Sequence, residues 1–315
     1  MLQLFMRFFL SRTDKTIGDV VVSLPVQKFL LDHYPSAQIF WLTRPETAPI
    51  LNNIPGITAV LHRYPDSNLE QIINYVKPDI LMNLGHRHRE IIPAAKNAGV
   101  PMRIAIPRGF KQAFDATHRI WAKRSGSGRH ESQLALDFLK PLGLFVSALL
   151  PPPPQLVLTP EEIALGQADI QRLPGSIPGS RLGVVVRGSG VGAFPSYHWW
   201  RKTLQALKDA GWNPIILSPP DESDLPSANI RGLMARLYAC DVVLSVSTGP
   251  AHLAAALNLP TLCLMGRRIR HGPVRWAPLG NRVEILQYPG EEDDLGSGMD
   301  RLDAGNVLAR LEKLR

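Results

Sequence analysis

The 315-residue chain predicts an α/β protein made of two doubly wound domains, each a parallel sheet with helices on both faces. Three observations support this prediction. The chain is about twice the usual length of one domain, strand-like and helix-like segments alternate in both halves, and a run of prolines separates the halves. Hydrophobic residues make up 45% of the chain and charged residues 20%, which is typical of a globular protein and excludes a disordered one.

The first half alternates short apolar runs with segments of helical spacing. The runs have the length and β-branched content of strands and cover residues 5–12, 38–43, 57–62, 79–85 and 102–106. Apolar residues recur with helical spacing between them, which predicts helices within 20–34, 46–54, 68–76, 89–99 and 130–143.

A proline run marks the boundary between the halves. Residues 151–154 are four consecutive prolines, which favour extended polyproline geometry and exclude a helix or a central strand. Thr159 and Pro160 then form a helix start, with Thr as N-cap and Pro at the first helical position. We therefore expect domains at residues 1–154 and 155–315.

The second half repeats the alternation. Strands are predicted over residues 181–188, 213–219, 242–246 and 260–266, and helices over residues 198–211, 233–241 and 249–258. Ligands of such sheets bind at the carboxyl ends of the strands. We expect the two domains to face each other across a cleft, with any chemistry at their strand-to-helix junctions.

The net charge of +8 is concentrated in one segment. Residues 1–150 carry +7 and residues 151–315 only +1, while residues 86–130 hold ten basic and two acidic side chains. Such a patch predicts an anionic partner, and the alternative is a solvated helix face. No nucleic-acid-binding motif accompanies the patch, so a nucleic-acid partner is not expected.

Neither a disulfide framework nor a metal site is expected. Cys240 and Cys263 lie in apolar runs and are most simply core residues, and they lack the spacing of metal ligands. The acidic run at residues 291–294 is either a solvated loop, which we favour, or a site for a divalent ion. No apolar run approaches the ~20 residues of a membrane span, and residues 1–12 resemble a first strand more than a signal peptide. These features predict a cytoplasmic protein without a cofactor.

The first strand-to-helix junction, residues 11–19, offers a carboxylate. Gly18 permits a close backbone turn, and Asp19 stands at the helix start. Asp19 is either an ordinary N-cap or a carboxylate that can deprotonate a substrate hydroxyl.

A second junction, residues 242–252, offers an anion site. A buried strand ends in a Ser-Thr-Gly turn. Pro250 suits the first helical position, and His252 lies in the first turn of the helix. Free N–H groups and the helix dipole there favour a diphosphate, and Thr248 as a simple N-cap explains only part of the pattern. Two further junctions give weaker signals. One holds Arg187 and Ser189, and the other holds Glu222, which either binds a ribose or lies in a solvated loop.

These junctions resemble the two sequence signatures of the heptosyltransferases of glycosyltransferase family 9. The resemblance extends from about residue 7 to residue 285 and rests on Ile17–Val21, Leu24-Pro25, Pro35–Ile39, Ser247–Leu257, Pro260 and Met265-Gly266.

The resemblance implies a GT-B fold of two Rossmann-like domains and a metal-independent, inverting transfer of heptose. The donor would be ADP-heptose, bound by the C-terminal domain. The acceptor would be the phosphorylated Kdo–lipid A inner core of lipopolysaccharide, bound by the N-terminal domain in peripheral contact with the anionic inner face of the cytoplasmic membrane. Asp19 would be the catalytic base. The expected donor-binding residues are Ser247, Thr248, Gly249, His252, Arg187, Ser189 and Glu222, and the expected acceptor-binding residues are Thr16, Gly18, Arg103, Arg119, Lys123, Arg124 and Arg129.

Two departures from the family pattern leave alternatives open. Ser247 stands where the family usually has Asp, and residues 192–195 lack the Lys that the family places near its donor phosphate. Arg187 could replace that cation. Otherwise the donor is a different nucleotide sugar, or the chain is a non-catalytic GT-B binding protein with a decayed donor site.

Overall fold

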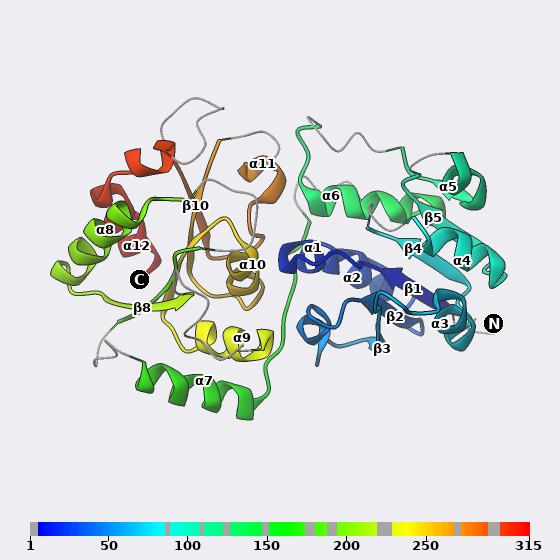
Figure 1. Ribbon diagram of the computed structural model, residues 1–315, viewed down its shortest axis with the longest axis horizontal. Helices are drawn as coiled ribbons and strands as arrows, with labels where there is room; N and C mark the ends of the chain where they lie inside the picture. The colour runs from blue at the N-terminus through cyan, green and yellow to red at the C-terminus, as the bar shows by residue number, and fades with distance from the viewer. Residues whose placement is uncertain are drawn as a thin grey trace. The chain divides into compact units, whose positions relative to one another are not determined.

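The computed structural model describes residues 6–85, 89–107, 110–121, 127–146, 151–173, 180–187, 194–218, 229–267, 272–288 and 297–315. The chain divides into two compact units, Met1–Pro152 and Pro153–Arg315. Each unit contains one all-parallel sheet with helices on both faces, which confirms the predicted α/β fold with two domains (Figure 1).

The sheet of the first unit has the strand order β3-β2-β1-β4-β5-β6. Its strands are β1 (Arg7–Ser11), β2 (Gln38–Thr43), β3 (Ile57–His62), β4 (Ile80–Asn83), β5 (Met102–Ala105) and β6 (His118–Arg119). The four residues of β4 and the last two of β5 are buried, as expected of strands covered on both faces. The two-residue β6 at the sheet edge was not predicted.

Helices cover both faces of this sheet. They are α1 (Ile17–Val21), α2 (Leu24–His33), α3 (Leu69–Val76), α4 (Ile91–Asn97), α5 (Phe110–Asp115) and α6 (Glu131–Leu136), with 3-10 helices η1 (Ala48–Leu51) and η2 (Asp137–Leu142). Apolar side chains of α3 and α4 pack with Phe9 and Leu81 in one core. On α2, Gln27 accepts a hydrogen bond from Trp41 Nε1 of β2 at 2.7 Å.

Two helical predictions in the first unit need correction. The helix expected over residues 20–34 is two helices, because Pro25 lies in the first turn of α2 and has no N–H to continue α1. The helix expected over residues 46–54 is only the 3-10 turn η1, which contains Pro49.

The second unit has the strand order β11-β10-β9-β7-β8. The strands are β7 (Arg181–Val185), β8 (Asn213–Ser218), β9 (Val242–Val246), β10 (Thr261–Met265) and β11 (Val283–Gln287). Its helices are α7 (Pro160–Arg172), α8 (Tyr197–Asp209), α9 (Ile230–Tyr238), α10 (Gly249–Ala256), α11 (Pro273–Trp276) and α12 (Ala304–Leu314), with the 3-10 helix η4 (Ser297–Arg301). The edge strand β11 and the helices α11 and α12 were not predicted.

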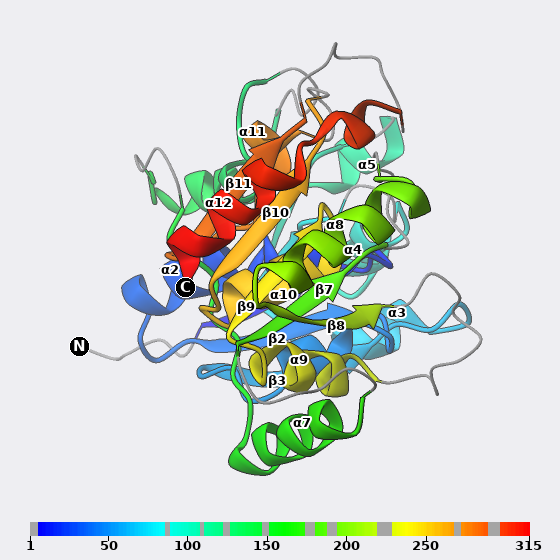
Figure 2. The same cartoon turned by 90° about the vertical axis from the view of Figure 1, so that its left-hand side faces the viewer.

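Figure 2 looks onto the face of this second sheet that α8 and α12 cover. Side chains from both helices, among them Trp199 and Leu311, share one core with the sheet. On α7, Thr159 is the N-cap, as the Thr-Pro pair predicted, and it also forms a capping box with Glu162. Gly166 lets α7 approach α9 closely, because a Cβ at this position would lie 2.2 Å from the carbonyl oxygen of Ala235.

Candidate functional site

The segment after β1 lies where the strand order of the first sheet reverses. β1 pairs with β2 on one side and with β4 on the other. Crevices for ligands form at the carboxyl ends of strands at such a reversal. The chain leaves β1 at Ser11, passes through Arg12 to Thr16, and enters α1, whose third residue is Asp19.

Two donors hold the Asp19 carboxylate. The Arg12 guanidinium donates from Nη2 to Oδ1, and the Thr16 hydroxyl donates to Oδ2. The Asp19 side chain remains 16% exposed, so the carboxylate is both oriented and open to solvent. Thr16, not Asp19, occupies the N-cap position of α1, so the alternative that Asp19 is an ordinary N-cap is wrong. Thr16 is exposed and Gly18 is buried.

Arg12 is a buried cation that the sequence analysis did not single out. Its side chain is 1% exposed, Nη1 donates to the carbonyl oxygen of Leu84 at 2.6 Å, and Nε lies 3.0 Å from Asp14 Oδ2. Arg12 therefore forms ion pairs with two carboxylates, Asp14 and Asp19. The signal available in the sequence was an Arg-Thr-Asp triplet directly after an apolar strand, where a charge must find a buried partner.

The segment that begins α6 lies beside α1. The Ser132 hydroxyl donates to the carbonyl oxygen of Val22, one residue beyond α1, at 2.7 Å.

Arg129, predicted to bind the acceptor, donates to both Asp137 oxygens at 2.7 and 3.0 Å, and these bonds raise its pKa. Burial alone would raise the pKa of Asp137, but hydrogen bonds from Arg129 and Lys140 outweigh it and hold that pKa below its usual value.

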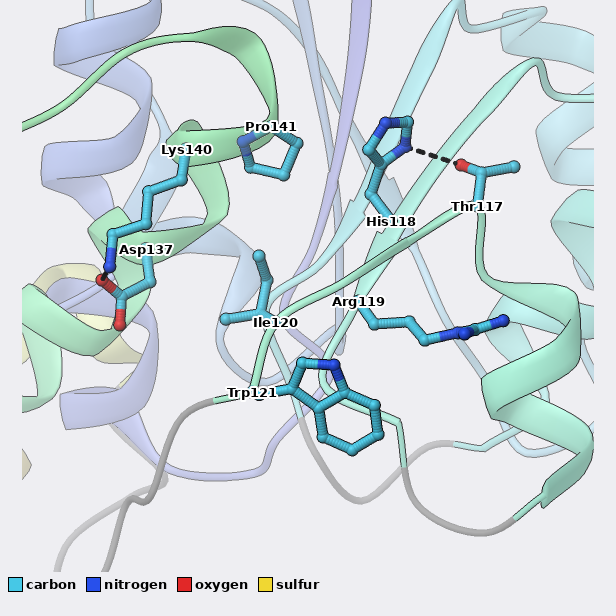
Figure 3. A pocket seen from close by; sticks show the side chains of 8 residues that line it. All are labelled: Thr117, His118, Arg119, Ile120, Trp121, Asp137, Lys140 and Pro141. Carbon is cyan, nitrogen blue, oxygen red and sulfur yellow. Dashed lines mark hydrogen bonds and ion pairs between the residues drawn. The ribbon is translucent and has the colours of Figure 1, made fainter.

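Arg103 and Arg119, two further predicted acceptor residues, lie on β5 and on its neighbour β6, the edge strand of the sheet. Arg103 donates to the carbonyl oxygens of Asp115 and Val100, and Arg119 Nε donates to the carbonyl oxygen of Ala113 at 2.6 Å. Arg119 also lines a hollow of about 580 Å³ together with His118, Trp121 and Lys140 (Figure 3). The predicted Lys123 and Arg124 lie outside the described residues.

In the second unit, the predicted donor residues follow two adjacent strands. Ser247 and Thr248 follow β9, and Arg187 follows β7, which pairs with β9 in parallel. Strand order reverses at β7, which lies between β8 and β9. The carboxyl ends of parallel strands meet at one edge of a sheet, so these residues share the edge at which ligands of such folds bind. Ser189 and Glu222 lie outside the described residues.

The turn from β9 into α10 leaves the start of the helix without a cap from Thr248. Thr248 occupies the N-cap position, but its hydroxyl donates to the Val246 carbonyl oxygen at 3.2 Å instead of accepting from a helix N–H. Gly249 begins the helix, Pro250 follows, and His252 is 5% exposed on the first turn. Backbone N–H groups at such a start attract anions.

Within the described ranges, no group of three or more His, Cys, Asp or Glu side chains is arranged to bind a metal ion. Among the same residues, no helix has the length and apolar character needed to cross a membrane.

Comparison with known proteins supports the family resemblance. Residues 193–295 match the model of glycosyltransferase family 9 (heptosyltransferase). Over 94% of this chain and 96% of the relative, the sequence is 24% identical to lipopolysaccharide heptosyltransferase 3 of Escherichia coli.

Solved structures share the two-domain fold. The glycosyltransferase family 9 protein of Veillonella parvula superposes with a TM-score of 0.81 at 14% identity, over 100% of this chain and 98% of that one. Escherichia coli heptosyltransferase WaaC with ADP-2-deoxy-2-fluoro heptose superposes with a TM-score of 0.68 at 17% identity, over 98% of this chain and 100% of that one.

Proposed function

We propose that this chain belongs to glycosyltransferase family 9, whose model residues 193–295 match, and that it transfers heptose from ADP-heptose to the Kdo–lipid A inner core of lipopolysaccharide with inversion and without a metal ion. The observation that carries the proposal is the Asp19 carboxylate, which Arg12 and Thr16 hold at the carboxyl end of β1 while it stays open to solvent.

Asp19 is suited to act as a general base. A base must be oriented toward the proton that it takes and must reach it in the substrate complex. Arg12 and Thr16 fix the orientation of the carboxylate, and its exposure leaves room for an acceptor hydroxyl. Asp19 takes the hydroxyl proton, the acceptor oxygen forms the new bond to the anomeric carbon, and the nucleoside diphosphate leaves with the bonding electron pair.

The start of α10 is suited to receive the departing diphosphate. The Thr248 hydroxyl does not cap the helix, and His252 lies on the first turn. Arg187, after the adjacent strand β7, adds a cation at the same edge of the sheet. We propose that Thr248, Gly249 and His252 bind the diphosphate and that Ser247 and Arg187 assist, with Arg187 in the role of the missing Lys. Stabilisation of charge that develops on a leaving group is typically a large term in catalysis.

The first unit is proposed to bind the anionic acceptor and to meet the membrane that carries it. Arg103 and Arg119 direct guanidinium N–H groups to backbone carbonyls, and among the described residues neither forms an ion pair with a carboxylate. Their positive charges therefore remain available to phosphate and Kdo carboxylate groups. Such a protein would act at the cytoplasmic face of the inner membrane.

The sequence departures favour one second candidate, a transferase of the same family with a different nucleotide-sugar donor. Ser247 and the missing Lys both fall on the donor side, whereas Asp19 and its partners remain. A family member that uses a different donor would differ at the donor-binding residues and would keep Asp19 and its partners.

The test is sugar transfer by wild-type and Asp19→Asn proteins, with product masses as the readout. Wild-type protein should add one heptose to a Kdo–lipid A acceptor, and Asp19→Asn should lower turnover by about 100-fold or more. Asp32→Asn is the matched control, because Asp32 is an exposed carboxylate paired with Lys28. Normal turnover by folded Asp19→Asn protein would refute the assignment of the base. A product of another mass would support the second candidate, and no binding of any nucleotide sugar at millimolar concentration would favour a non-catalytic protein.

A further inference from the structure

Three aromatic side chains of the first unit are exposed within twelve residues of sequence. Phe110 is 87% exposed, Phe114 is 75% exposed and Trp121 is 79% exposed. We call them the aromatic surface. Large apolar side chains grouped on a surface commonly mark a site where a partner or a membrane covers them.

The aromatic surface spans α5 and the residues just after β6. Phe110 and Phe114 are four residues apart on α5 and therefore share one side of that helix. Arg119 of β6 donates to the carbonyl oxygen of Ala113, which ties β6 to α5 beside Phe114. Figure 3 shows Arg119 and Trp121 on one side of their segment and His118 on the other. A basic and an aromatic side chain, Arg119 and Trp121, thus share one side of the segment that is bonded to α5.

Basic residues outnumber acidic residues in the part of the chain that carries the aromatic surface. Residues 96–140 hold nine basic and three acidic side chains. All three acidic side chains are buried, namely Asp115, Glu131 and Asp137. Two basic side chains of the same stretch pair with these carboxylates while staying half exposed: Lys96, 54% exposed, pairs with Asp115, and Lys140, 53% exposed, pairs with Asp137. Arg119 is exposed and donates to a backbone carbonyl oxygen. Because basic residues outnumber the acidic ones three to one, the stretch keeps a positive net charge after these pairs are formed, and Arg119 and the three aromatic rings reach solvent.

We propose that the aromatic surface inserts into the headgroup region of an anionic lipid bilayer and anchors the first unit there. Aromatic rings partition well into the membrane interface, and nearby Arg and Lys side chains pair with lipid phosphates. Charge complementarity selects a lipid surface over a second copy of the chain, because two copies would bring the same positive surfaces together. The choice of a membrane rests on the proposed function, and the new element is that three aromatic side chains, separate from Asp19, supply the anchor.

The test is co-sedimentation of the full chain with sucrose-loaded vesicles, without donor or acceptor. Wild-type protein should bind vesicles that contain phosphatidylglycerol and bind pure phosphatidylcholine vesicles more weakly. Phe110→Ser/Phe114→Ser/Trp121→Ser should lower the partition coefficient on the anionic vesicles by about tenfold or more. The matched control is Tyr75→Ser on α3, because Tyr75 is an aromatic side chain of the same unit with 79% exposure. It should bind as the wild-type protein does.

A spectroscopic readout covers the case in which the triple variant fails to fold. Brominated lipids in the anionic vesicles should quench part of the tryptophan fluorescence of the wild-type protein, and Trp121→Phe should remove that part. Absence of binding to anionic vesicles, equal binding by the triple variant, or quenching unchanged in Trp121→Phe would overturn the proposal. So would a wild-type dimer that the triple variant breaks while vesicle binding stays unchanged. The Asp19→Asn protein should bind vesicles normally, so failure of the anchor and failure of the transfer reaction are distinguishable.

Discussion

Arg12 shows how a single buried cation organises the candidate site. Removing a guanidinium from water costs several kcal/mol, and the cost is offset only by partners of good geometry. Asp14, Asp19 and the Leu84 carbonyl oxygen supply those partners within the loop after β1 and the neighbouring strand end. The same contacts that stabilise Arg12 therefore orient the carboxylate proposed as the base.

Replacing Arg12 should destabilise the first unit strongly. Arg12→Met removes the cation and leaves the buried Asp14 without its ion-pair partner, so we expect the free energy of unfolding to fall by about 3–5 kcal/mol. Urea denaturation of the full chain measures it. The control is Lys28→Met, which breaks the exposed Lys28–Asp32 pair and should cost less than about 0.5 kcal/mol. Equal losses in the two variants would contradict the argument.

At the residue scale, the sequence predicted where a side chain stands relative to a strand end better than it predicted which side chain it pairs with. Asp19 and Thr248 could be proposed from the sequence because their spacing from a strand end can be read directly from the chain. Arg12 was missed, because its partners depend on the path of the loop. Arg129 was predicted from local charge alone, and counting charges could not foresee that Asp137, eight residues later, binds it.

Among the elements, α7 and α9 illustrate how a helix start and a helix–helix contact share one carboxylate. Glu162 completes the capping box of Thr159 and also accepts hydrogen bonds from Arg231 on α9, whose Nε lies 2.7 Å from Glu162 Oε1. The hydrogen bond from Arg231 is the main reason that the pKa of Glu162 lies below its usual value. The ionised form of Glu162 therefore stabilises the contact between the two helices.

This contact should weaken in acid. Because the folded-state pKa of Glu162 is lowered, its contribution to stability is fully present above the pKa of the unfolded chain, about 4.3. It is lost as the pH falls through the folded-state value. Glu162→Gln should therefore lower the free energy of unfolding at pH 7, and the difference from wild type should shrink toward pH 3. Denaturant titrations across this range test it, with exposed Glu46→Gln as control. A difference that does not change with pH would contradict the assignment.

Elements with a full run of apolar residues were predicted well, and short or peripheral ones were not. The central strands β1, β4, β9 and β10 were predicted because they are buried on both faces and their sequences are almost wholly apolar. The edge strand β11 is only half-buried, and its sequence carries a weaker signal. The point at which a helix ends also depends on backbone chemistry. Pro25 separates α1 from α2 because it has no N–H to continue the first helix.

At the scale of the whole molecule, two units have separate cores and different charge. The described core clusters each draw on one unit alone. The net charge lies almost wholly in residues 1–150. The proposed division of labour gives the anionic acceptor to the first unit and the nucleotide to the second.

Adding ADP should therefore stabilise the second unit selectively. At an ADP concentration about 100 times its Kd, binding adds about 2.7 kcal/mol, so the slowest amide protons of β9 and β10 should exchange about 100-fold more slowly. The amide protons of β1 and β4 should change little. Hydrogen-exchange mass spectrometry of the full chain measures both sets. Equal protection of the two units, or protection of the first alone, would contradict the proposed donor site.

The chain passes from one unit to the other only once, between Pro152 and Pro153. Recombination between two related genes within the codons for these prolines would therefore exchange one complete unit and leave both sheets intact. The surface proposed to recognise the lipid and the turn proposed to recognise the nucleotide would then be inherited separately. New pairings of donor and acceptor would arise by recombination between relatives, without a series of point changes through either core.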